Sequence, residues 1–176
     1  AVAAHFAERG VAVSPERVLL TAEQILQGAE EELSVEERAR RERMRLSAKG
    51  IASYQLSKDG TRVLVPLSGR LFVIERSGGD VTELKSDAGY PLDPKFSPDG
   101  RYVSCVRDSE LYVIEIATGT ELRVTTDAGG NITNALAEFI AQEEMGRYRG
   151  YWWAPDSRRI LYQQTDRAPV ALWHIL

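Results

Sequence analysis

The sequence has little of several features that would define a function, and each shortage excludes a class of protein. A single cysteine among 176 residues, Cys105, rules out a disulfide within the chain. No apolar run approaches the roughly 20 residues that a membrane-spanning helix needs, so no membrane span is expected in this chain. Acidic residues outnumber basic ones, 26 to 22, which gives a net charge of −4. Because nucleic-acid binding generally needs a basic face, we expect no nucleic-acid partner.

The motif of a serine nucleophile is missing as well. There is no Gly-x-Ser-x-Gly, the sequence that exposes a nucleophilic serine on a strained turn. The two histidines, His5 and His174, lie near opposite ends of the chain and are interpreted as structural. No His, Cys, Asp and Glu cluster has metal-ligand spacing and no glycine-rich loop suits a phosphate, so we expect no metal and no cofactor. The neighbours of Cys105 are typical of a buried strand, which favours a packed, unreactive thiol.

What the sequence does contain is internal repetition with a period of 40 residues. Ser57-Lys-Asp-Gly60 recurs as Ser97-Pro-Asp-Gly100. Three further landmarks keep this spacing: Val63 and Val103, Leu71–Ile74 and Leu111–Ile114, Asp87–Gly89 and Asp127–Gly129. A third, looser copy begins at Trp153-Ala-Pro-Asp156-Ser157, with Ile160 in the place of Val63.

Each copy is predicted to contain about four short strands joined by tight turns. Asp-Gly suits a hairpin because glycine accepts positive φ, and the following runs are rich in β-branched and aromatic residues. The expected strands cover residues 62–66, 71–75 and 81–84, then 102–106, 111–116 and 121–125. A 40-residue, four-stranded repeat has the size of one propeller blade. We therefore predict an all-β fold, a partial β-propeller of about two to three antiparallel blades over residues 50–176. A β-sandwich of hairpins is the alternative, although a sandwich does not demand sequence repetition.

Residues 1–49 differ in kind and are predicted to form a helical N-terminal arm. Ser34-Val-Glu-Glu37 reads as a capping box, helix formers continue from Glu36 to Leu46, and Gly50 is a natural stop. Arginines and glutamates alternate along this helix, which predicts a solvated face with i,i+4 ion pairs. The members of this set are Arg38, Arg40, Arg41, Arg43 and Arg45 with Glu36, Glu37 and Glu42.

An insertion breaks the period, because the second and third copies are 57 residues apart. The extra residues lie around 131–150, and their centre, Ala135–Met145, has a helical pattern that predicts a helix around 133–146. Asn131 or Thr133 could cap its start. Adjacent glutamates such as Glu143 and Glu144 commonly form only a solvated face, but a helix between blades lies where binding groups gather. The apolar face of this helix is predicted to contain Leu136, Phe139 and Ile140.

Residues from about 30 to 175 resemble the N-terminal propeller region of bacterial dipeptidyl peptidase IV, in the prolyl oligopeptidase family of serine peptidases. The most specific segments are Asn131–Asn134, Ala137–Ile140, Glu143–Met145 and Gly150–Asp156. Further segments that resemble this family are Leu33–Arg43, Gly50-Ile51, Thr165–Val170 and Trp173–Ile175.

The resemblance implies that Glu143 and Glu144 bind the free α-ammonium of a peptide substrate. Two carboxylates can accept the three donors of an ammonium as charge-assisted bonds. They would act as a ruler for an enzyme that releases dipeptides after Pro or Ala. Family enzymes often place an arginine near the substrate carbonyl; Arg70 is a loose candidate here. The catalytic domain is expected beyond residue 176, so this chain alone should have no peptidase activity. The resemblance to bacterial enzymes implies a location in the periplasm or cytoplasm of a bacterium.

Two other functions stay open at this point. One is a non-catalytic propeller-repeat module that binds protein or peptide partners, and the other is a purely structural or assembly fragment. Two and a half blades cannot close a propeller, and open blades leave strand edges with unpaired backbone groups. We therefore expect a homo-oligomer, formed by edge pairing or by exchange of the arm, or else reliance on further chain.

Overall fold

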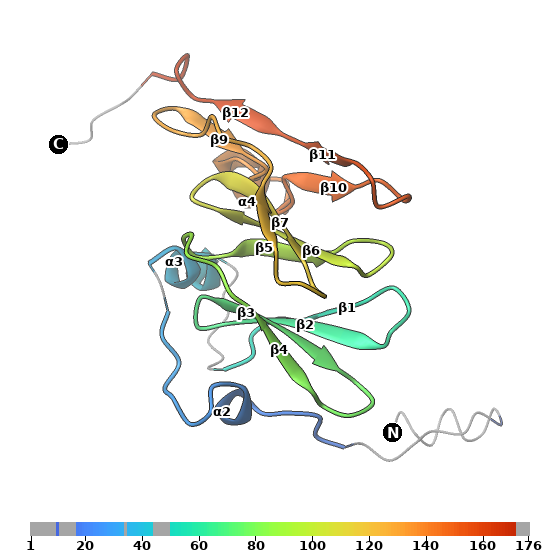
Figure 1. Ribbon diagram of the computed structural model, residues 1–176. Coiled ribbons are helices and arrows are strands. Elements are labelled where there is room, and N and C mark those ends of the chain that lie inside the picture. The colour runs from blue at the N-terminus through green and yellow to red at the C-terminus, as the bar shows by residue number, and fades with distance from the viewer. Residues whose placement is uncertain (1–9, 11–16, 34, 44–49, 172–176) are drawn as a thin grey trace.

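Antiparallel sheets make up most of the structure and stack one above another in chain order (Figure 1). The computed structural model describes residue 10 and residues 17–33, 35–43 and 50–171. The first four-stranded sheet contains β1 (Gln55–Leu56), β2 (Arg62–Leu67), β3 (Arg70–Glu75) and β4 (Val81–Leu84). The second contains β5 (Leu92–Phe96), β6 (Tyr102–Arg107), β7 (Glu110–Glu115) and β8 (Glu121–Arg123). Each sheet is a simple meander, because consecutive strands pair with each other.

The 40-residue sequence repeat is also a structural repeat. The β2–β3 register begins with Arg62 opposite Glu75, and the β6–β7 register begins with Tyr102 opposite Glu115. The repeated turns also correspond, since Gly60 and Gly100 have φ of 70° and 72°, the left-handed region that the Asp-Gly turn requires. The prediction of two equivalent four-stranded units is therefore confirmed.

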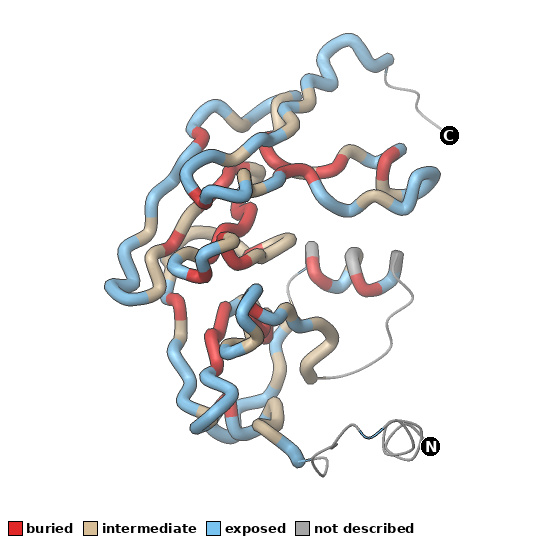
Figure 2. The backbone as a smooth tube through the Cα atoms, turned by 90° about the vertical axis from the view of Figure 1, so that its right-hand side faces the viewer, coloured by how far each residue is buried: buried red, intermediate tan, exposed pale blue. Residues whose placement is uncertain are grey.

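Both faces of these sheets are buried, and this decides between a sandwich and a propeller. Figure 2 shows buried segments along the middle of the stacked sheets, with exposed residues at the turns. One apolar cluster lies between the two four-stranded sheets and includes Leu64 and Leu71 from the first, Val103 and Ile114 from the second. The opposite face of the first sheet packs under the arm. A two-sheet sandwich would leave its outer faces in water, whereas sheets stacked in series are successive propeller blades. The predicted partial β-propeller is therefore the fold of this chain.

The arm supplies the cover for the first blade. A capping box between Thr21 and Gln24 starts the short helix α2 (Ala22–Ile25). Ile25 and Leu26 are buried in a cluster with residues of β2 and β3, among them Val65 and Phe72. The second helix of the arm, α3 (Val35–Arg43), lies where a helix was predicted. The predicted capping residue Ser34 and the predicted helix end at 44–46 lie outside the described residues.

The prediction of a wholly solvated charged face on α3 is wrong for one pair. Arg41 makes the expected i,i+4 bond to Glu37 at 2.9 Å, and it also bonds Glu31 at 2.7 Å. Glu37 and Arg41 are each only 6% exposed. Burial alone would lower the pKa of Arg41, but its bonds to the two carboxylates raise the pKa overall. One arginine shared by two carboxylates compensates the desolvation, and Glu31 also accepts from the Gly50 amide at 2.6 Å.

A third unit follows the two blades and confirms the looser sequence copy. It contains β9 (Ile132–Asn134), β10 (Tyr151–Trp153), β11 (Ile160–Tyr162) and β12 (Gln164–Asp166), which form the pairs β10–β11 and β9–β12. Trp153 lies opposite Ile160, as Phe96 lies opposite Val103. Tyr151 and Ala135 pack on the second blade. Within the described part of the chain, no helix has both the length and the apolar character needed to cross a membrane.

Candidate functional site

The insertion runs from β9 to β10 and carries the helix α4 (Phe139–Glu143) (Figure 1). Its base is a closed stem of backbone hydrogen bonds. The amide of Ala135 donates to the carbonyl of Gln163 at 2.8 Å, and the amide of Gln163 donates to the carbonyl of Gly150 at 2.8 Å. Leu136 and Arg149 then form an isolated antiparallel bridge. The two ends of the insertion are thus both hydrogen-bonded to Gln163, between β11 and β12, so that α4 projects from a fixed base.

The stem is so tight that one position has no room for a side chain. A Cβ on Gly150 would lie 2.3 Å from the carbonyl oxygen of Ala135 and 2.4 Å from its carbonyl carbon. Ala135 itself is fully buried and has a φ of 59°, which is costly for a residue with a side chain. Gly150 therefore permits the close crossing of the two backbones at the base of the insertion.

The helix is shorter than predicted, and its cap is a different residue. The prediction of a helix around 133–146 is wrong because residues 132–134 pair with β12 and Ala135 leaves the helical region. Asn131 and Thr133 do not cap α4. Its N-cap is Glu138, whose carboxylate accepts from the amides of Ile140 at 2.7 Å and Ala141 at 2.9 Å. Glu138 was not among the predicted caps; its signal is an acidic residue directly before the first helical residue, within reach of the amides two and three positions later.

The two glutamates singled out by sequence lie together at the C-terminal end of α4. Glu143 is the last helical residue and Glu144 is the C-cap, and both are exposed. The amide of Glu144 bonds the carbonyl of Ile140 at 2.9 Å, and Gly146 with a φ of 60° turns the chain away. The C-terminal end of a helix carries partial negative charge, so the carboxylates and the helix end act in the same direction. A cation is the ligand that this arrangement favours.

The apolar side chains around the pair are exposed, contrary to the predicted single apolar face. Phe139 is 68% exposed and Ile140 is 58% exposed, while Leu136 packs with the cluster around Tyr151. Leu136 belongs to the stem rather than to the helix, so it does not share a face with the other two. Met145 is also 70% exposed. Three exposed apolar side chains therefore lie on or next to the short helix that carries the two carboxylates.

The serines of the repeated turns and the single cysteine are in structural positions. Ser57 and Ser97 are buried in the repeated turns, where each hydroxyl donates to an aspartate, Asp59 or Asp99, at 2.6 Å. Cys105 is fully buried, and burial raises the pKa of its thiol to about 11. His5 and His174 lie outside the described residues. Among the described residues, no three His, Cys, Asp or Glu side chains could hold a metal ion together.

Arg70, the loose candidate for a substrate carbonyl, is engaged within its own blade. Its guanidinium makes two bonds to Glu83, with Nε to Oε1 at 2.8 Å and Nη2 to Oε2 at 2.5 Å. It also lies over the ring of Phe72, 4.9 Å from the centroid. The hydrogen bonds to Glu83 lower the pKa of that carboxyl. A bidentate pair of this kind leaves little of the guanidinium for a ligand.

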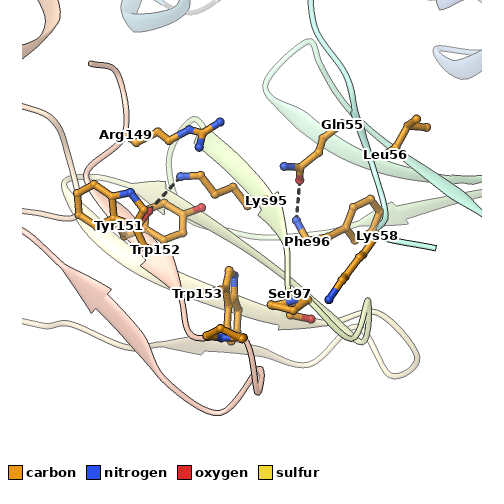
Figure 3. Close-up of a pocket in the computed structure, with 12 residues that line it drawn as sticks. Gln55, Leu56, Lys58, Lys95, Phe96, Ser97, Arg149, Tyr151, Trp152 and Trp153 are labelled. Carbon is orange, nitrogen blue, oxygen red and sulfur yellow. Dashed lines mark hydrogen bonds between the residues drawn. The ribbon is translucent and has the colours of Figure 1, made fainter. Parts of the chain in front are cut away.

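A basic hollow of about 410 Å³ lies along β1, β5 and β10, one strand from each of the three units (Figure 3). Lys95 lies 3.7 Å from the ring centroid of Tyr151 and pairs with Asp93. Burial lowers the pKa of Lys95, and the charge of Arg149 adds to this effect against the opposing influence of Asp93. The side chain of Gln55 accepts from the amide of Phe96 at 2.8 Å and so joins the first two blades. The basic side chains of this hollow favour acidic ligands, whereas the acidic pair Glu143 and Glu144 on α4 favours a cation.

Comparison with known proteins places the fold and the insertion in one family. Residues 51–176 match the family described as "Dipeptidyl peptidase IV (DPP IV) N-terminal region", so the chain belongs to this family. The solved structure of Porphyromonas gingivalis dipeptidyl peptidase 4 superposes with a TM-score of 0.61 at 25% identity and covers 71% of this chain.

Curated proteins with similar sequences are also dipeptidyl peptidases. Human dipeptidyl peptidase 8 is 27% identical over 170 residues, which is 81% of this chain. Dipeptidyl aminopeptidase A of Saccharomyces cerevisiae is 31% identical over 93 residues, which is 49% of this chain. The chain spans 19% of the human protein and 10% of the yeast protein. It is thus similar to one part of a dipeptidyl peptidase, the N-terminal propeller region.

Proposed function

We propose that this chain is the substrate-gating part of a serine dipeptidyl peptidase that releases N-terminal dipeptides after Pro or Ala. Glu143 and Glu144 hold the α-ammonium of the peptide, while a C-terminal hydrolase domain outside this chain performs the cleavage. The observation that carries the proposal is the pair of adjacent, exposed carboxylates at the end of a helix on a closed stem. Membership of the family supports this assignment.

The chemistry of the pair explains how a gate of this kind measures length. Two carboxylates accept an ammonium through charge-assisted bonds, which are stronger than bonds between neutral groups. A peptide that continues upstream has an uncharged amide in this place and meets the helix itself. Once the hydrolase domain covers Phe139 and Ile140, the removal of water strengthens the attraction between the carboxylates and the ammonium. Only two residues then fit between the glutamates and the cleavage point.

The experiment is a pair of single substitutions, Glu143→Ala and Glu144→Ala, in the complete protein. Each removes a charge-assisted contact worth about 1.5–3 kcal/mol, so kcat/KM for a Xaa-Pro chromogenic substrate should fall roughly tenfold to 150-fold. The matched control is Glu42→Ala, an exposed glutamate on α3, which should change nothing. Equal losses on free and N-acylated substrates would make the pair structural, whereas a complete protein that turns over neither substrate would favour a non-catalytic binding module.

A further inference from the structure

The first two blades carry the same cross-strand ion pair with the charges reversed. In the first blade Arg70 on β3 pairs with Glu83 on β4. In the second, 40 residues later, Glu110 on β7 pairs with Arg123 on β8 at 3.1 Å. The two pairs have the same separation of 13 residues but different surroundings. The side chain of Arg70 is 44% exposed, whereas that of Glu110 is 1% exposed.

The reversal places an acceptor where three further donors converge. Besides Arg123, the carboxylate of Glu110 accepts from the hydroxyl of Thr125, from the amide of Ala128 at 2.5 Å and from the side chain of Asn134 at 3.0 Å. Burial alone would raise the pKa of Glu110, but these hydrogen bonds lower it overall. An arginine, which has only donors, could not serve this position in the second blade.

One of these donors belongs to the residue from which the insertion departs. Asn134 ends β9, is fully buried, and directly precedes Ala135 at the base of the stem. Its side-chain nitrogen donates to Glu110 and, at 2.7 Å, to Asp127, while its oxygen accepts from Gln164 of β12 at 3.0 Å. Every hydrogen-bonding group of this amide is therefore used, and its position is fixed relative to both β7 and β12.

The returning end of the insertion is anchored on the same blade. The hydroxyl of Tyr151 donates to the carbonyl of Asp93 at 2.6 Å and accepts from the hydroxyl of Ser104 at 3.1 Å. The indole of Trp153 donates to the Ser104 hydroxyl at 2.8 Å. Both ends of the insertion are thus bonded to buried groups of the second blade, one through Asn134 and one through Tyr151.

We infer that Glu110 and Asn134 are positioning residues that set the place of α4 and thereby the affinity of the enzyme for the substrate ammonium. This inference rests on the proposed function of Glu143 and Glu144. The reversed ion pair is the feature that adapts an ordinary blade to hold the stem. Loss of the network leaves the carboxylates present but misplaced, so substrate binding weakens while the bond-breaking step in the hydrolase domain proceeds as before.

The test compares Asn134→Ala and Glu110→Gln in the complete protein with Glu83→Gln, the matched change in the first blade. We expect the first two variants to raise KM for a Xaa-Pro substrate at least tenfold with kcat within twofold of the wild type. Glu83→Gln should leave both constants unchanged. In a Glu143→Gln/Glu144→Gln background, adding Asn134→Ala should change KM no further, because no ammonium contact is left to misplace.

A milder variant covers the case in which the buried changes prevent folding. Gln164→Ala removes two hydrogen bonds to Asp127 and Asn134 from an exposed side chain and should raise KM about threefold. If Glu143→Gln/Glu144→Gln raises KM but the network variants do not, the positioning role is wrong and the proposed function stands. If the double glutamate variant leaves KM unchanged, the proposed function fails, and the positioning role fails with it.

Discussion

The crossing of two backbones at the base of the insertion makes Gly150→Ala the most informative single substitution. The added methyl group would lie 2.3–2.4 Å from three backbone atoms of Ala135 and Leu136. Backbone atoms cannot rotate away as a side chain can, so the stem must open. Overpacking of an interior costs about 1–3 kcal/mol. The short distances and the closed hydrogen-bond pattern place this variant at the upper end of that range, so we expect a local loss of stability of about 3 kcal/mol.

Hydrogen exchange reports this loss at the stem itself. The amides of Ala135 and Gln163 close the stem, and a local destabilisation of about 3 kcal/mol should raise their exchange rates roughly 100-fold. The control is Gly78→Ala, since the nearest atom to a Cβ there is the flexible carboxylate of Asp80 at 3.1 Å. That variant should exchange like the wild type. Unchanged protection of Ala135 and Gln163 in Gly150→Ala would refute the tight stem.

Three further predictions concern a buried thiol, a turn carboxylate and the self-association of the chain. The Cys105 thiol, buried and with its pKa raised to about 11, should not react with a thiol reagent at pH 8 until the protein is unfolded; rapid reaction of the folded protein would contradict its burial. Hydrogen bonds from Ser57 and Thr61 lower the pKa of Asp59 to about 2. The ionised carboxylate should therefore stabilise the turn fully above about pH 3.8, and this stabilisation should be lost as the pH falls through about 2. A titration midpoint of the Asp59 carboxyl near 3.8 would exclude these bonds. We also expect the isolated chain to self-associate, because blades at the end of an open stack expose strand edges and apolar groups such as Leu161, which is 70% exposed. A monomer mass from light scattering at micromolar concentration would contradict this prediction.

The blades could be predicted from the sequence because the repeat conserves the residues that form each turn. Ser57 and Ser97 make the same bond to the aspartate two positions later, and the glycines at 60 and 100 have the same positive φ. Each of these contacts lies within one turn, so a short sequence determines it. The third copy was recognisable from Pro155 and Asp156, which match Pro98 and Asp99. In the structure Ser157 takes the positive φ of the missing glycine, at 58°.

The insertion was predictable only in outline, because distant contacts decide its boundaries. The predicted helix covered residues 133–146, but pairing of β9 with β12, about 30 residues away, takes residues 133 and 134 into a strand. The positioning role of Glu110 was likewise absent from the prediction. Aligning the two copies reveals only the exchange of charges, because Arg70 and Glu83 are replaced by Glu110 and Arg123 at the same offset.

The proposed binding of an ammonium by Glu143 and Glu144 can be measured as one affinity ratio. Calorimetry on the complete protein should compare a Xaa-Pro dipeptide with its analogue in which a hydroxyl replaces the α-amine. The wild type should prefer the amine at least tenfold, and Glu143→Gln/Glu144→Gln should reduce this preference to about one, since charge-assisted bonds are lost. A preference that survives unchanged in the double variant would show that Glu143 and Glu144 do not bind the ammonium.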